Sequence, residues 1–66
     1  MYNTIYRELA GHNRATAKML AEHVGITYGS MLNKLGGKTE FTLSEMRKIQ
    51  DFFGGTITLD ELFADT

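Results

Sequence analysis

Glycine positions constrain this chain more than any other feature of its sequence. Seven glycines among 66 residues interrupt it at positions 11, 25, 29, 36, 37, 54 and 55. Between most of these glycines the apolar residues recur three and four positions apart, which is the spacing of a helix buried on one side. The only β-branched run, residues 56–58, is too short to predict a strand. The sequence therefore predicts an all-α fold, a compact bundle of five short helices.

Helix starts are marked by polar residues that can cap them. The expected caps are Asn3, Thr16, Thr27, Thr42 and Thr58. Thr42 with Glu45, and Thr58 with Glu61, have the spacing of a capping box, in which two side chains satisfy backbone amides at a helix start. The expected helices are 3–11, 16–24, one from Thr27 to the glycines at 36–37, one from Thr42 to the glycines at 54–55, and a short one after Thr58.

Each expected helix carries one apolar face that we assign to the core. The assigned residues are Ile5, Tyr6 and Leu9, then Ala17, Leu20, Ala21 and Val24, then Met31 and Leu35, then Leu43, Met46, Ile49 or Gln50, and Phe53, and finally Leu59, Leu62 and Phe63. Residues 1–66 are expected to form a single domain, because a chain this short builds only one small core.

Composition argues against several functions. The chain has no cysteine, so we expect neither a disulfide nor a cysteine-ligated metal. His12 and His23 are eleven positions apart, with no third ligand at a recognised spacing, and no combination of nucleophile, base and acid is evident. We therefore expect no enzymatic activity, no cofactor, no metal and no small-molecule ligand. No apolar run approaches the length of a membrane span, so we expect a cytoplasmic protein without membrane contact.

The charge of the chain is unevenly distributed. The net charge is −1, which by itself disfavours a nucleic-acid partner. Residues 12–48, however, hold six cations and three anions and sum to +3, whereas residues 49–66 hold four anions and no cation. The middle of the chain could therefore meet phosphates while its C-terminal third stays away from them.

The segment from Thr16 to Lys38 carries the most functional information. Two helices of about eight residues joined by a short turn that contains glycine are typical of a helix-turn-helix. Gly25 permits the sharp turn, Ala21 is small enough for close helix packing, and Ile26 reaches the core from inside the turn. Anchoring by Met31 and Leu35 would leave the opposite side of the third helix exposed.

These residues resemble the Cro and phage-repressor type of helix-turn-helix proteins, whose fold is that of lambda repressor. The resemblance rests on Leu20-Ala21, Val24-Gly25-Ile26-Thr27, Ser30-Met31, Lys34-Leu35 and Gly37-Lys38. The runs 40–45 and 57–63 look like those of small members encoded by prophages of Gram-positive bacteria. The similarity spans about residues 5–64. Ala17 departs from the family, which usually places glutamine there, and Gly29 stands where many members carry a polar residue.

The resemblance implies a role in DNA recognition for particular residues. Base contacts would fall to Tyr28, Gly29, Leu32 and Asn33, with the Asn33 amide suited to adenine. Tyr28 could instead extend the buried face of its helix. Phosphate contacts would come from Asn13, Arg14, Thr16, Ala17, Thr27, Lys34, Lys38 and Thr39. Arg47 and Lys48 are expected to be solvated charges outside this set.

The sequence thus favours a sequence-specific, DNA-binding transcriptional regulator, such as a prophage repressor, located with the nucleoid when bound. It would act as a homodimer on a pseudo-palindromic operator. Phe52, Ile57, Leu59 and Phe63 are the candidate dimer interface, although Phe52 could belong to the core. The alternative is a protein-interaction module on the same fold, such as an antirepressor, a partner of a larger regulator or, less favoured, an antitoxin. The acidic C-terminal third, the apolar Leu32 and the departure at Ala17 favour that alternative.

Overall fold

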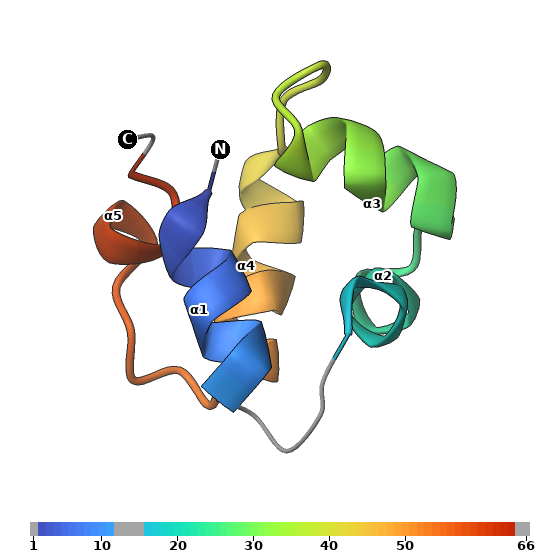
Figure 1. Ribbon diagram of the computed structural model, residues 1–66. Helices are drawn as coiled ribbons and strands as arrows, with labels where there is room; N and C mark the ends of the chain where they lie inside the picture. Colours follow the sequence, from blue (N-terminus) through green and yellow to red (C-terminus); the bar gives the residue numbers. More distant parts are fainter. Residues whose placement is uncertain (1, 12–15, 65–66) are drawn as a thin grey trace.

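The computed structural model describes residues 2–11 and 16–64, and these form five α-helices without any strand (Figure 1). The helices are α1 (Asn3–Gly11), α2 (Ala17–Val24), α3 (Tyr28–Leu35), α4 (Leu43–Phe52) and α5 (Leu59–Leu62). Their bounds agree with the expected segments to within one or two residues. Within these residues the longest helix has ten residues, about half of what a bilayer-spanning helix needs.

Four threonines cap helices as their positions predict. The hydroxyl oxygens of Thr16 and Thr27 accept from the third amide of α2 and α3, at 3.3 and 3.1 Å. At α4 the capping box is complete, since Thr42 accepts from the Glu45 amide and the Glu45 carboxylate accepts from the Thr42 amide at 2.8 Å. Each such cap contributes about 1 kcal/mol to stability.

Two of the expected helix starts differ in detail. Thr58 caps α5, but the Glu61 carboxylate meets the Thr58 hydroxyl at 3.2 Å rather than the Thr58 backbone amide. Asn3, expected as a cap, lies inside α1, and the carbonyl of Tyr2 accepts from the Tyr6 amide. Helix α1 therefore begins one residue earlier than a cap at Asn3 would place it.

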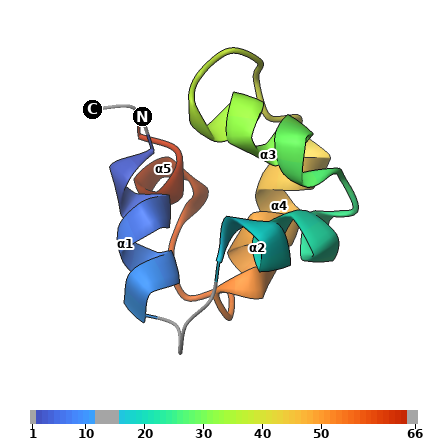
Figure 2. The same ribbon diagram turned by 45° about the vertical axis from the view of Figure 1, so that its right-hand side comes forward.

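Helix α4 lies in the middle of the bundle, with α1 and α5 on one side and α2 and α3 on the other (Figures 1 and 2). Helix α2 packs against α3 and α4, and α5 packs against α4 and α1. The core consists of apolar side chains from every helix and from the segment before α4: Ile5, Leu9, Leu20, Ala21, Val24, Met31, Leu35, Phe41, Ile49, Phe53 and Leu62. No polar or charged side chain is buried among the described residues.

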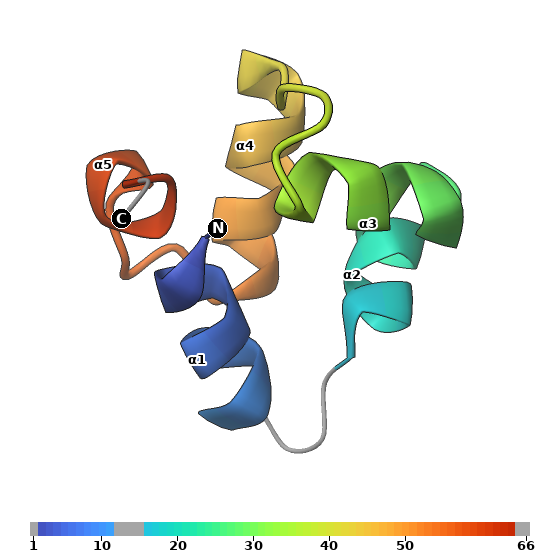
Figure 3. The same ribbon diagram turned by 45° about the horizontal axis from the view of Figure 1, so that its top comes forward.

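Two residues assigned to the core from the sequence are exposed instead. Tyr6 retains 39% of its accessible surface and Leu43 retains 55%. Leu43 is the first residue of α4, and this end of the helix extends past the neighbouring helices (Figure 3). Tyr6 follows Ile5 by about 100° around α1, and only the Ile5 and Leu9 side of that short helix faces the core.

An aromatic cluster that the helical spacing does not predict closes one end of the core. The rings of Tyr2, Phe41 and Phe63 meet edge to face, with centroids 5.2 to 5.7 Å apart. These rings join the start of α1, the segment before α4 and the end of α5. Such pairs contribute about 0.5–1.5 kcal/mol beyond the area that they bury.

The turn between α2 and α3 has only three residues, Gly25 to Thr27. Gly25 adopts the left-handed conformation, with φ of 90°. The carbonyl of Ala21 accepts from the amides of both Gly25 and Ile26, at 2.8 and 3.1 Å. Ile26 packs against the core from inside the turn. The predicted glycine stop and the predicted role of Ile26 are therefore confirmed.

Gly25, in this turn, and Gly29, in α3, should respond oppositely to alanine. A Cβ at Gly25 would meet no atom within 4 Å, so Gly25→Ala should lose about 1–2 kcal/mol of stability solely through its positive φ. Gly29, inside α3, has equally open space but an ordinary helical backbone, so Gly29→Ala should gain up to about 1 kcal/mol. Urea unfolding of the two variants checks this, and equal effects would contradict the assigned turn.

Candidate nucleic-acid interface

Helix α3 lies at the edge of the bundle, on the opposite side from α5 (Figures 1 and 3). Its inner side is fixed by Met31 and Leu35, which are completely buried. We call four exposed residues of α3 the α3 outer face: Tyr28, Gly29, Leu32 and Asn33. Ser30, beside them, is exposed as well. These four share one side because they are one and four residues apart.

The α3 outer face matches the set of residues that the sequence singles out as base contacts. Tyr28 is 50% exposed, so it does not extend the buried side of the helix, and Leu32 is 41% exposed. Asn33 offers an amide that can donate and accept together. Nothing in the protein requires glycine at position 29, because a Cβ there would be unobstructed. The structure thus groups these residues and leaves their contact with DNA a prediction.

Several of the predicted phosphate contacts lie at the start of α2, directly before α3 or shortly after it, and carry available donors. The hydroxyls of Thr16 and Thr27 accept hydrogen bonds as caps, which leaves each O–H free to donate to a phosphate oxygen. The Ala17 side chain is half-buried, so its contribution would be its amide, which has no acceptor within the helix. Lys38 and Thr39 are exposed after α3, and the Lys38 amide fixes that turn through the Asn33 carbonyl at 2.9 Å. Asn13, Arg14 and His12 lie outside the described residues.

Lys34 has a different environment from the other predicted phosphate contacts. Its side chain is only 15% exposed, and its ammonium lies 3.2 Å from the Glu45 carboxylate. The same ammonium donates to the Glu40 carbonyl at 2.9 Å and lies 5.9 Å from the centre of the Phe41 ring. Lys34 therefore links the end of α3 to the start of α4, and its contact with a phosphate stays a prediction.

The partner of Lys34 is the carboxylate that completes the α4 capping box. The hydrogen bond from the Thr42 amide, opposed by partial burial and reinforced by Lys34, lowers the pKa of Glu45 below its usual value of 4.5. The Glu45 carboxylate thus accepts a hydrogen bond from the Thr42 amide at the start of α4 and pairs with Lys34 in the last turn of α3. This contact and the buried Met31 and Leu35 together hold α3 against the bundle.

The predicted dimer residues are all partly buried within the single chain. The Phe52 ring lies 5.4 Å from the ring of His23 and 5.3 Å from that of Phe53, so Phe52 packs against the core while retaining some exposure. The backbone carbonyl of Ile57 accepts a hydrogen bond from the side-chain amide of Gln50 at 2.9 Å. Phe63 belongs to the aromatic cluster. Leu59 is likewise half-buried.

His23 lies in an ion-pair contact rather than in a cluster of metal ligands. Its Nε2 lies 3.2 Å from the Asp51 carboxylate on α4. Within residues 2–11 and 16–64, no three histidine, cysteine, aspartate or glutamate residues are placed to hold one ion. The contact joins α2 to α4.

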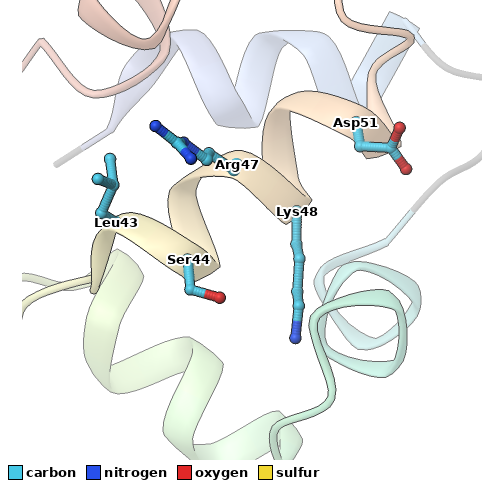
Figure 4. A pocket seen from close by; sticks show the side chains of 5 residues that line it. All are labelled: Leu43, Ser44, Arg47, Lys48 and Asp51. Atoms are coloured by element: carbon cyan, nitrogen blue, oxygen red, sulfur yellow. The ribbon is translucent and has the colours of Figure 1, made fainter.

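One open depression of about 490 Å³ lies along the exposed side of α4 (Figure 4). It is lined by Leu43, Ser44, Arg47, Lys48 and Asp51. The Arg47 side chain points away from α3, whereas Lys48 donates to the Val24 carbonyl at 3.4 Å, at the end of α2 (Figure 4). Both cations are exposed, as expected.

Comparison with protein-family models, with curated proteins and with solved structures gave no match.

The lowered pKa of Glu45 predicts acid-sensitive stability. Because the folded state holds this carboxylate ionised more strongly than the unfolded chain does, its contribution is complete above about pH 4.5 and is lost as the pH falls through the folded pKa. Glu45→Gln preserves the capping geometry but lacks the charge. The stability difference between wild type and this variant should shrink between about pH 6 and about pH 3 in urea unfolding. A difference that stays constant over this range would contradict the assigned role.

Proposed function

We propose that this protein is a sequence-specific, DNA-binding transcriptional regulator in which α2 and α3 act as a helix-turn-helix. In this proposal α3 enters the major groove and its outer face contacts base edges, while the start of α2 contacts the phosphate backbone. The observation that carries the proposal is the α3 outer face, a helix surface exposed along its length while Met31 and Leu35 fix the other side.

The geometry of the turn supports the proposed helix-turn-helix. A helix that enters a groove must project from the body of the protein and keep a fixed angle to it. The three-residue turn at Gly25 fixes the start of α3, and the contact between Lys34 and Glu45 fixes its end. Both ends of the proposed reading helix are therefore held by contacts that leave the α3 outer face free.

The distribution of charge also supports it. Lys18 on α2 and Lys38 after α3 are exposed, and they belong to the stretch of the sequence that sums to +3. The acidic side chains of α5, Asp60 and Glu61, are exposed at the opposite edge of the bundle (Figure 1). DNA bound along α3 would therefore lie far from the acidic end of the domain, which weakens the repulsion implied by the net charge.

A single domain of this size makes few phosphate contacts, so we propose that it binds as a homodimer to two half-sites about 34 Å apart. The candidate dimer surface comprises the half-buried residues Phe52, Ile57, Leu59 and Phe63. Their remaining exposed area would be covered by the partner subunit. A repressor of the prophage type, acting in the bacterial cytoplasm, fits this arrangement.

The proposed phosphate contact of Lys38 can be tested by salt dependence. Lys38→Ala should weaken binding to duplex DNA uniformly across sequences and should reduce the slope of log affinity against log salt by about one. Arg47→Ala removes the same charge from a side chain that points away from α3, so it should leave the slope nearly unchanged. Fluorescence anisotropy from roughly 50 to 200 mM salt measures both variants. Equal changes in slope would contradict the proposed orientation on DNA.

One observation favours the alternative, a protein-interaction module. The α3 outer face carries two large exposed side chains, Tyr28 and Leu32, which could instead contact an apolar surface of a partner protein.

Asn33→Ala separates the two functions. If Asn33 contacts a base, the Asn33→Ala variant should bind a selected DNA site about 1–3 kcal/mol more weakly than wild type does. Its affinity for unrelated DNA and its helicity should hardly change. Competition binding with the two kinds of duplex, together with circular dichroism, provides the measurement. If neither wild type nor variant binds duplex DNA at roughly 50 mM salt, the DNA-binding proposal is wrong and the interaction module takes its place.

A further inference from the structure

The α3 outer face carries no charge, and this limits the bases that it can read. Its side chains are one phenol, one aliphatic group and one amide, from Tyr28, Leu32 and Asn33. The charged residue on α3 is Lys34, whose ammonium is held by Glu45 and by the Glu40 carbonyl. The cations nearest in sequence, Lys18 and Lys38, belong to α2 and to the segment after α3.

Guanine is poorly matched to such a surface. Its major-groove edge presents two acceptors, N7 and O6, and arginine or lysine is the side chain that usually binds them. Neither is free on the α3 outer face. Adenine presents an acceptor beside a donor, which the Asn33 amide can satisfy with two hydrogen bonds.

The apolar part of the α3 outer face fits the one apolar group in the major groove. Tyr28 and Leu32 are four residues apart, one turn along α3, and form a continuous exposed strip. The C5 methyl of thymine is the only feature of a base edge that such a strip can bury. Gly29 lies beside the strip, and the empty space at its Cβ position allows the helix backbone to approach the bases closely.

We infer that the α3 outer face selects A·T base pairs, recognising thymine through its methyl group at Leu32 and Tyr28 and adenine through the Asn33 amide. The inference rests on the proposed function, because it places α3 in the major groove. It adds the chemical class of the recognised site: a half-site whose contacted positions are A·T pairs and whose affinity depends on thymine methyl groups.

The test begins with selection of bound sequences from random duplex DNA by the full chain. The selected duplex is then synthesised again with deoxyuridine in place of each thymidine in turn, which removes one methyl and preserves Watson–Crick pairing. At one or two positions per half-site, wild type should bind the uracil duplex roughly fourfold more weakly for each methyl that it buries.

Two variants identify the side chain responsible. For Leu32→Ala, the ratio of the affinity for the thymine duplex to that for the uracil duplex should be close to one at the position that Leu32 contacts. Leu43→Ala is the matched control, because Leu43 is a comparably exposed leucine on α4, and it should keep the wild-type ratio. Both positions are exposed, so both variants should fold, and circular dichroism verifies this.

The outcomes separate the inference from the proposed function. Selected sites with A·T pairs at the contacted positions and a methyl effect that disappears in Leu32→Ala support the inference. Selected sites with guanine at those positions, or equal binding of thymine and uracil duplexes, overturn it while DNA binding stands. Failure to select any duplex overturns the proposed function and the inference together.

Discussion

The carbonyl of Ala21 accepts hydrogen bonds from the amides of both Gly25 and Ile26, and this pair of bonds ends α2 and begins the three-residue turn to α3. Such a turn needs the left-handed backbone of Gly25, which an L side chain adopts only at a cost. It sets the direction in which α3 leaves α2. Because of that direction Met31 and Leu35 reach the core, and the opposite side of α3 is left exposed. The core and the candidate site are therefore two consequences of the same turn.

The far end of α3 is held by electrostatics rather than by backbone geometry. The ion pair between Lys34 and Glu45 is mostly covered, and both partners have further hydrogen bonds, which offsets the cost of removing their charges from water. Its functional consequence is that α3 keeps no free cation. In the proposed complex, a phosphate-binding charge would come from neighbouring segments, where Lys18 and Lys38 are exposed. The surface that would discriminate between bases and the charges that would provide affinity are thus on different elements.

Features that depend on a few neighbouring residues could be predicted from the sequence, and features that depend on distant ones could not. The threonine caps, the glycine turn and the buried sides of α2 and α3 follow from spacings of three or four residues. In the sequence Lys34 resembles a free cation, because the spacing does not reveal its partner. That partner, Glu45, lies eleven residues away on another helix. The burial of Phe41 has one local signal, since an apolar residue directly before a helix cap often packs on the first turn. The burial of its partner Tyr2 depends on contacts across the bundle.

The net charge of −1 is consistent with a protein whose discrimination comes from uncharged contacts. Non-specific DNA affinity grows with the number of phosphates neutralised, and it counts against a regulator that must find one site among many. Acidic α5 lies opposite α3 (Figure 1), and the exposed cations that we propose to act on DNA are few, among them Lys18 and Lys38. Contacts from Tyr28, Leu32 and Asn33 would exchange no counterions, so their contribution would persist as salt weakens the rest. Weak electrostatic attraction would therefore raise the ratio of specific to non-specific binding, and a second copy on a second half-site would restore the affinity that each copy lacks.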